Sequence, residues 1–330
     1  MPIESDRVIT GGVVAPPRGV GYGGASAAGR RAAAASRASA ATPSGWDSVG
    51  WFASPGVAPT AGDDEPADWG TDQETVGLRA MQCIEQPGRE PAVLFIHGYC
   101  QSSAYWAPTL ERIGKAGVRG IAPDLPGFGA SASLPEPYNL PGYADRLAEL
   151  LDARGLRRIV LVGGSMGGVV AQLFALRYPA RLLRLLLVAT GAAVADPKAG
   201  LAKADVIAAT PWDAAAVQPI VAGFFHRTPG PAELQEYQRI AGLASHRAAV
   251  EAMRSNAQTR TLDRLGEIRI PTLIIQGRHD RARTPEHGAL MRERIPGARM
   301  EVLEHSGHTP QLEEPEAFYN LALPFLLSAG

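Results

Sequence analysis

The sequence contains only two cysteines, Cys83 and Cys100, among its 330 residues. Two thiols in a chain of this size do not form a disulfide framework, and their spacing does not match a cysteine-based metal motif. The sequence therefore predicts neither a disulfide-stabilised fold nor a cysteine-bound metal. A reducing compartment, the cytoplasm, is the simplest location to expect.

The chain also lacks an excess of charge of either sign and has no long apolar run. Its formal net charge is −1, which provides no general attraction to nucleic acid or to an anionic membrane surface. No stretch of about 18 apolar residues is present, so we expect no membrane-spanning helix. The hydrophobic fraction of 45% is enough for a sizeable core. A small-molecule partner fits these properties best.

Residues 1–75 differ in composition from the rest, and we predict that they form a flexible N-terminal extension. Residues 11–44 are rich in Gly, Ala, Ser, Pro and Arg and contain no acidic residue. Such a segment buries too little apolar surface to offset the entropy of ordering its backbone. The alternative is a targeting segment, because the run after Arg30-Arg31 resembles organelle transit peptides and, loosely, a twin-arginine export signal. The protein would then be organelle-targeted or exported.

The second part of this extension, residues 45–75, is a tryptophan-containing linker. It carries Trp46, Trp51, Phe52 and Trp69 among acidic, Pro and Gly residues. Each tryptophan can bury a large apolar area, and a fully solvated linker rarely contains three of them. We therefore predict that this linker packs on the domain that follows.

From residue 76 onward, short apolar runs alternate with amphipathic stretches. The predicted strands are Val76–Ile84, Ala92–His97, Gly120–Pro123, Arg158–Gly163, Leu183–Ala189, Thr272–Gly277 and Met300–Leu303. The predicted helices are Tyr105–Ile113, Tyr143–Ala153, Ser165–Arg177, Pro285–Ile295 and Pro315–Leu326. Several strands are continuous in Val, Ile and Leu, which is typical of parallel strands covered on both faces. The alternation predicts an α/β fold class with a mostly parallel central sheet flanked by helices.

Residues 191–268 interrupt this alternation. They contain no strand pattern, but helical patterns at Ala232–Ala244 and Ser245–Ala257 begin after Pro or Ser. In open α/β sheets, ligands bind at the carboxyl ends of the strands. We therefore predict a core made of residues 76–190 and 269–330, with residues 191–268 inserted as a helical cap over that edge.

The strongest local motif is Gly163-Gly-Ser165-Met-Gly167, which follows an apolar strand and precedes a helical run. This placement is the one that a nucleophile elbow requires. The sharp turn forces the serine into a strained backbone conformation that only small neighbours tolerate, and it exposes the hydroxyl at a helix N-terminus. A phosphate-binding loop is the alternative for a glycine-rich turn, but no Lys-Ser/Thr follows and the Gly-x-Gly-x-x-Gly order is absent.

Two further residues complete a candidate catalytic set. Asp280 follows the strand Thr272–Gly277, and His308 follows the next strand, so the order along the chain is Ser165, Asp280, His308. Serine is a weak nucleophile at neutral pH and needs an adjacent imidazole to accept its proton. The imidazole in turn needs a carboxylate to hold its tautomer. For the neighbouring His305 and His279, loop packing is the expected role.

The loop after the strand Ala92–His97 is the candidate oxyanion loop. Acyl transfer needs two N–H donors aimed at the developing oxyanion, usually one from this loop and one from the residue after the nucleophile. We assign them to the backbone N–H groups of Tyr99 and Met166. His97 is expected to brace the loop, and Cys100 borders the substrate pocket or is simply a small buried side chain.

These residues resemble the α/β-hydrolase superfamily over about residues 76–327. The motifs that carry the resemblance are His97-Gly98, Asp124-Leu-Pro126-Gly-Phe-Gly129-Ala-Ser131, the Ser165 elbow, Gly277-Arg-His-Asp280, and Gly307-His308-Thr-Pro310-Gln-Leu-Glu313-Glu-Pro315-Glu-Ala-Phe318. In relatives the histidine of the Gly-His-x-Pro segment is catalytic, which favours His308. Serine at the elbow differs from the aspartate of haloalkane dehalogenases and epoxide hydrolases. The resemblance implies the smaller capped branch of carboxylesterases, lactonases and carbon–carbon hydrolases.

The sequence thus predicts a serine hydrolase that needs no metal or cofactor and cleaves an ester, thioester or lactone of a small, largely apolar substrate through an acyl-enzyme. Trp212, Phe224, Phe225 and Tyr237 of the cap are candidate pocket residues, with helix packing as their alternative role. The competing functions are a carbon–carbon bond hydrolase or acyltransferase on the same triad, and a non-catalytic small-molecule receptor. The oxyanion loop is less glycine-rich than is usual in carbon–carbon hydrolases, which argues against that option.

Overall fold

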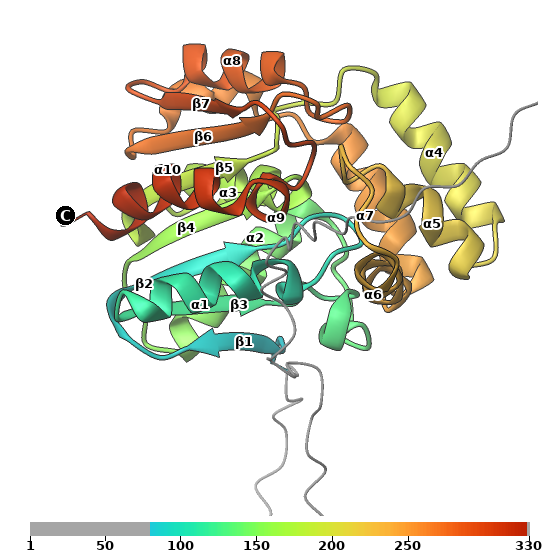
Figure 1. Cartoon of the computed structure of the whole chain (residues 1–330), viewed down its shortest axis with the longest axis horizontal. Helices are drawn as coiled ribbons and strands as arrows, with labels where there is room; N and C mark the ends of the chain where they lie inside the picture. The colour runs from blue at the N-terminus through green and yellow to red at the C-terminus, as the bar shows by residue number, and fades with distance from the viewer. Residues whose placement is uncertain (1–79, 329–330) are drawn as a thin grey trace, which may run out of the picture. The chain divides into compact units, whose positions relative to one another are not determined.

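The computed structural model describes residues 80–328. The N-terminal extension, its targeting segment, its tryptophan-containing linker and the start of the first predicted strand lie outside these residues. Within them, seven strands form one sheet in the order β1-β3-β2-β4-β5-β6-β7 (Figure 1). The strands are β1 (Cys83–Gln86), β2 (Arg89–Ile96), β3 (Val118–Pro123), β4 (Ile159–Gly164), β5 (Leu182–Val188), β6 (Thr272–Gly277) and β7 (Arg299–Leu303).

The sheet is mostly parallel, as predicted. β1 runs antiparallel to β3 at one edge, and every other neighbouring pair is parallel. The central strands are buried on both faces: in β2, both Leu94 and Phe95 are inaccessible although successive side chains point to opposite faces. This explains the continuous apolar runs of the sequence and confirms the predicted fold class.

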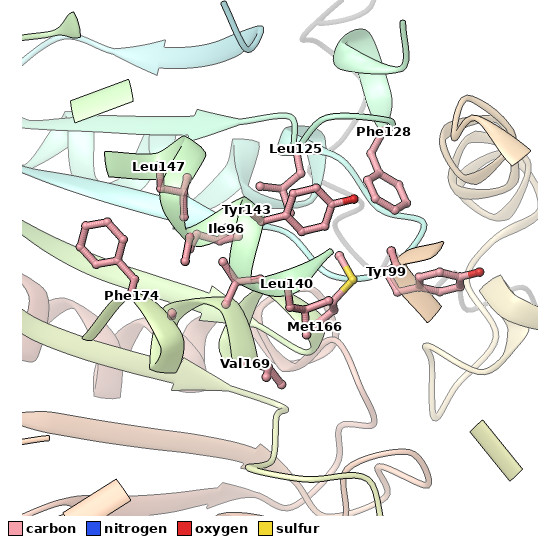
Figure 2. Close-up of a cluster of buried hydrophobic side chains, with 14 of the residues drawn as sticks. Ile96, Tyr99, Leu125, Phe128, Leu140, Tyr143, Leu147, Met166, Val169 and Phe174 are labelled. Atoms are coloured by element: carbon pink, nitrogen blue, oxygen red, sulfur yellow. The ribbon is translucent and has the colours of Figure 1, made fainter. Parts of the chain in front are cut away.

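Helices cover both faces of the sheet. One face packs against α1 (Ala107–Lys115) and α10 (Pro315–Leu327), and the other packs against α2 (Leu140–Ala153), α3 (Met166–Arg177) and α8 (Pro285–Arg294). Figure 2 shows part of the hydrophobic core between the sheet and α2 and α3, where Ile96 of β2, Leu147 of α2 and Phe174 of α3 lie together. Burial of each such side chain stabilises the fold by about 1.5–3 kcal/mol.

Four helices lie in the interval that was predicted to be the cap, between β5 and β6. They are α4 (Pro197–Ala209), α5 (Ala214–Ala222), α6 (Pro231–Gly242) and α7 (His246–Gln258). α4 packs against α7, and α5 packs against α6. Figure 1 shows this group beside the carboxyl ends of the parallel strands.

The structure differs from the predicted elements at several boundaries. The described part of the first strand is Cys83–Gln86 rather than Val76–Ile84, because pairing with β3 and not the apolar run sets its limits. α2 begins at Leu140, three residues earlier than predicted, because the Asn139 side chain accepts a hydrogen bond from the Gly142 N–H and caps the helix. No helix was predicted from the sequence at the positions of α4 and α5, although Asp196 and Asp213 cap them in the same way.

His97 joins the end of β2 to the loop that follows β3. Its Nε2 accepts a hydrogen bond from the Leu125 N–H at 3.0 Å, and its Nδ1–H donates to the Gly98 carbonyl at 2.8 Å. Protonation of Nε2 would break the first bond. Burial lowers the pKa of His97, and the charge of Asp124 only partly opposes this effect. The imidazole is therefore a neutral brace, as the sequence suggested.

The ends of β6 and β7 depend on a close approach of two backbones. A Cβ atom on Gly277 would overlap the carbonyl oxygen of Gly307, so only glycine allows the contact. The Arg278 N–H donates to the Leu303 carbonyl at 2.8 Å in the same region. This approach brings the segments that carry Asp280 and His308 together.

We expect Gly277→Ala to lower the free energy of unfolding by about 1–3 kcal/mol, because the new methyl group must displace the Gly307 backbone. Urea denaturation measures the change. Gly242→Ala is the matched control, since a Cβ at that exposed helix position meets no other atom within 4 Å; it should be neutral or stabilising. Equal free energies of unfolding for the two variants would show that the approach of Gly277 to Gly307 does not require glycine.

We expect His97→Gln to be less stable than the wild type at about pH 7.5 and to lose less stability on acidification to about pH 5.5. The unfolded chain takes up a proton at His97 near its usual pKa, whereas the folded chain does not, so wild-type stability falls as the pH drops through that range. Urea denaturation at both pH values gives the comparison. His305→Gln, at an exposed histidine, is the matched control. If the stability of His97→Gln falls on acidification as steeply as that of the wild type, the neutral brace is contradicted.

Candidate active site

Ser165 lies at the junction of β4 and α3. β4 ends at Gly164, α3 begins at Met166, and Ser165 between them has φ 51° and ψ −118°. A positive φ at a non-glycine residue is strained, and such strain concentrates at functional sites. The turn also needs Gly167, because a Cβ there would overlap the carbonyl oxygens of the β2 end. The strained, partly exposed serine that the sequence predicted is present.

Two side chains behind the elbow hold it in this conformation. The Thr190 hydroxyl donates to the Ser165 carbonyl at 2.6 Å. The Gln276 amide accepts from the Thr190 N–H at 3.1 Å and donates to the Thr190 carbonyl at 2.8 Å. All of these groups are buried except for part of Ser165, so their hydrogen bonds are costly to break. Sequence reasoning missed both residues, although each lies at or just after the end of a predicted strand.

His308 contacts both other members of the predicted set. Its Nε2 lies 2.7 Å from Ser165 Oγ, and its Nδ1 lies 2.7 Å from Asp280 Oδ2. Both distances are those of strong hydrogen bonds. The His308 side chain is 5% exposed and the Asp280 side chain is inaccessible, so water competes little for either bond. The structure therefore brings together the three residues that lie far apart in the sequence.

Asp280 is held as a carboxylate by the groups around it. Burial alone raises its pKa, but the charge and hydrogen bond of His308 and the N–H groups of Arg283 and Ala282 outweigh burial, and the net pKa is lowered. The two N–H groups donate to Oδ1 at 2.9 and 2.8 Å. Oδ2 is thereby left to accept the bond from His308 Nδ1–H, which fixes the tautomer with Nε2 facing Ser165.

Glu313 organises the loop that carries His308. Its Oε1 accepts from the Gly307 N–H at 2.9 Å and from the Thr309 hydroxyl at 3.1 Å. Its Oε2 accepts from the N–H of His226, in the segment between α5 and α6, at 2.7 Å. Sequence reasoning quoted Glu313 only as part of a family motif. It lies at the end of the short helix α9 (Pro310–Glu313), four residues after the N-cap Thr309, which is one residue more than the spacing of a capping box, so no local rule identified it.

The two assigned oxyanion donors flank the nucleophile. Met166 is the first residue of α3, so its N–H has no partner within the helix. The loop that carries Tyr99 lies against Ser165, because a Cβ on Gly98 would be only 3.1 Å from Ser165 Cβ. The Tyr99 hydroxyl donates to the Ala249 carbonyl of α7 at 3.0 Å, which ties this loop to the inserted helices. Figure 2 shows the Met166 and Tyr99 side chains beside each other.

Three of the predicted pocket residues belong to an aromatic cluster that reaches His308. The Phe224 ring stacks on the His308 ring with centroids 6.1 Å apart, and its carbonyl accepts the His308 N–H at 3.0 Å. The Tyr105 ring contacts both Phe224 and Tyr237, at 6.2 and 5.0 Å. Phe225 contacts Tyr237 at 4.9 Å. Phe224 therefore borders the triad, and Phe225 and Tyr237 lie farther out, where both also line a cavity of about 300 Å³.

The other two predicted pocket residues have different surroundings. The Trp212 indole stacks on His246 at 6.0 Å, so its contact lies among the inserted helices. Cys100 is fully buried with φ 52° beside the oxyanion loop, and burial raises the pKa of its thiol to about 12. At neutral pH this thiol is uncharged and is not a nucleophile.

The other histidines near the triad have the packing roles expected from the sequence. The His279 ring stacks on the His226 ring at 3.7 Å. The His305 N–H donates to Glu314 at 2.8 Å, and its exposed side chain contributes no described bond to Ser165 or Asp280. Between residues 80 and 328, no group of three or more His, Cys, Asp or Glu side chains is arranged to hold a metal. No helix in that part of the chain has the length and apolar character needed to cross a membrane.

Known proteins resemble this chain over most of its described length. A 2-hydroxy-6-oxo-6-phenylhexa-2,4-dienoate hydrolase from Comamonas testosteroni is 32% identical over 256 residues, which cover 73% of this chain and 89% of that protein. The solved esterase of Thermogutta terrifontis superposes with a TM-score of 0.66 at 28% identity, covering 74% and 92% of the two chains. The enol-lactonase of Burkholderia xenovorans LB400 has a TM-score of 0.70, covers 75% and 96%, and at 23% identity shows the fold alone.

The family model for the alpha/beta hydrolase fold matches residues 91–315, more than half of the chain. The matched region contains most of β2, all of β3 to β7, the elbow, the inserted helices and the loop that carries His308. The order of the strands and the positions of the three polar residues agree with that match. This chain therefore belongs to the alpha/beta hydrolase family of enzymes.

Proposed function

We propose that this enzyme is a serine hydrolase that cleaves an ester, thioester or lactone of a small, largely apolar substrate through an acyl-enzyme on Ser165. The observation that carries the proposal is the continuous hydrogen-bonded chain Ser165–His308–Asp280, with 2.7 Å at each link. It provides a nucleophile, a base and an orienting carboxylate in one geometry.

In the first half of the reaction, His308 Nε2 accepts the proton of Ser165 Oγ as the oxygen attacks the substrate carbonyl. The N–H groups of Tyr99 and Met166 donate to the resulting oxyanion. The tetrahedral intermediate then collapses, and the protonated His308 gives its proton to the leaving oxygen or sulfur. The acyl group remains on Ser165.

In the second half, His308 removes a proton from water, which attacks the acyl-enzyme and releases the acid. Asp280 stabilises the imidazolium in both halves and stays ionised, in agreement with its lowered pKa. An acyltransferase differs only in that another nucleophile replaces this water. The buried aromatic cluster around Phe224 supports an apolar substrate, because it removes solvent from one side of His308.

Carbon–carbon bond hydrolysis is the second candidate, and one observation favours it. The substrate named for the Comamonas testosteroni relative, 2-hydroxy-6-oxo-6-phenylhexa-2,4-dienoate, contains no ester, so its hydrolysis breaks a bond between carbons. The same triad and oxyanion donors fit attack on its ketone. The 28% identity to a solved esterase supports the first candidate.

We expect Ser165→Ala to abolish both hydrolysis of short-chain p-nitrophenyl esters and labelling by a fluorophosphonate, because each needs the same oxygen. Labelling of the wild type without ester turnover would retain the triad and favour ring-fission substrates or acyl transfer. The loss of visible absorbance of 2-hydroxy-6-oxo-6-phenylhexa-2,4-dienoate then separates these two functions: consumption of this compound favours carbon–carbon hydrolysis over acyl transfer. A wild type that is neither labelled nor active on any of these substrates would support the receptor function instead.

We expect Asp280→Asn to reduce kcat by about 10⁴-fold, because the amide can hold His308 in the wrong tautomer. Steady-state kinetics on the best p-nitrophenyl ester measures the loss. Asp263→Asn, which alters an exposed carboxylate paired with Arg260, is the matched control and should retain full activity. A loss smaller than tenfold for Asp280→Asn would mean that another acid supports His308.

A further inference from the structure

Tyr105 is a buried tyrosine between the oxyanion loop and the inserted helices. It belongs to a short 3-10 turn, Ser103–Trp106, that directly follows the oxyanion loop, and it is 1% exposed. Its ring meets Phe224 edge-on at 6.2 Å, and Phe224 stacks on His308. Tyr237 covers another side of the ring at 5.0 Å. Tyr105 is therefore two ring contacts from the catalytic imidazole.

The hydroxyl of Tyr105 has no hydrogen-bond partner among the described residues, although it is inaccessible. Other buried tyrosines of the same core do have partners: Tyr99 donates to Ala249, Tyr138 to Leu134 and Tyr143 to Pro126. A buried hydroxyl without a partner destabilises a fold by its desolvation, so such a group in a native structure calls for an explanation. A hydroxyl that is two ring contacts from His308 and has no protein partner is free to bind a polar group of the substrate.

The surroundings indicate which kind of group the hydroxyl would bind. Burial raises the pKa of Tyr105 well above its usual value, so the hydroxyl keeps its proton and acts as a donor. Its neighbours Cys100 and Tyr237 are uncharged at neutral pH, since burial raises the pKa of each to about 12. Among charged side chains, the carboxylate of Glu236 acts on it and also raises its pKa. These surroundings disfavour a carboxylate and favour a neutral acceptor.

We propose that the Tyr105 hydroxyl donates a hydrogen bond to a second, neutral carbonyl oxygen of the substrate, separated from the scissile carbonyl by an apolar stretch that packs on Phe224. This inference rests on the proposed function, because it places the scissile carbonyl at Ser165. Tyr105 then selects for substrates that carry a ketone, amide or second ester group. The interaction is worth about tenfold in selectivity, the usual value of a neutral hydrogen bond.

Matched pairs of esters test the proposal. In one pair the acyl chain is pentanoyl or 4-oxopentanoyl on p-nitrophenol; in the other the alcohol is butyl or 3-oxobutyl on acetate. We expect the wild type to prefer the oxo member of one pair in kcat/KM. Tyr105→Phe should lose about tenfold of that preference. The pair that shows the preference, acyl or alcohol, would identify the half of the substrate that Tyr105 contacts.

Tyr143→Phe is the matched control, because its hydroxyl already bonds to the Pro126 carbonyl. We expect this control to be less stable than the wild type but unchanged in selectivity, whereas Tyr105→Phe should be at least as stable as the wild type. The proposal is overturned if the wild type and Tyr105→Phe have the same ratio of kcat/KM for the oxo and alkyl esters. It is also overturned if the wild type hydrolyses both members of each pair equally well. The hydroxyl would then bond to a buried water.

A binding measurement separates this inference from the proposed function. Calorimetric affinities of the intact esters for Ser165→Ala, with and without Tyr105→Phe, report the contact without turnover. About tenfold tighter binding of the oxo ester to Ser165→Ala, lost in the double variant, supports Tyr105 even if the wild type hydrolyses neither ester. If the wild type hydrolyses the esters but the oxo and alkyl members do not differ in binding or in kcat/KM, the proposed Tyr105 contact is wrong and the proposed serine hydrolase function stands.

Discussion

The pair of hydrogen bonds made by the His308 imidazole is the interaction on which the arrangement of this molecule depends. It can form only if the end of β4, the end of β6 and the loop after β7 meet within a few ångströms. The backbone approach of Gly277 to Gly307 and the strained turn at Ser165 are the local conditions for that meeting. Both are costly in isolation and persist because the buried sheet holds them.

The inserted helices are tied to the same loop rather than simply placed over it. The Phe224 carbonyl accepts the His308 N–H, and the His226 N–H donates to Glu313, which also binds the Gly307 N–H. A shift of this segment would therefore disturb the histidine loop directly. The inserted segment and the loop that carries His308 are therefore parts of one hydrogen-bonded unit, which fixes the position of the imidazole.

Much of the fold followed from local patterns, and the failures have specific causes. Continuous apolar runs identified the buried strands β2, β4, β5 and β6 because these are covered on both faces. The edge strand β1 was placed too early, since its limits come from pairing with β3. The helices α4 and α5 were not identified, because their buried faces contact other inserted helices and leave no regular apolar stripe.

The sequence by itself determined the chemistry that this chain can offer: a serine in a strand-to-helix turn between glycines, followed in order by an aspartate and a histidine at later strand ends. These signals are local, because steric limits on a sharp turn leave few residue types that fit. Only the tertiary structure decided what supports and surrounds that set. Thr190 and Glu313 act through hydrogen bonds between segments far apart in the chain, and the Tyr105 ring packs on Phe224 and Tyr237 of the inserted segment. No local pattern encodes a distance across the fold.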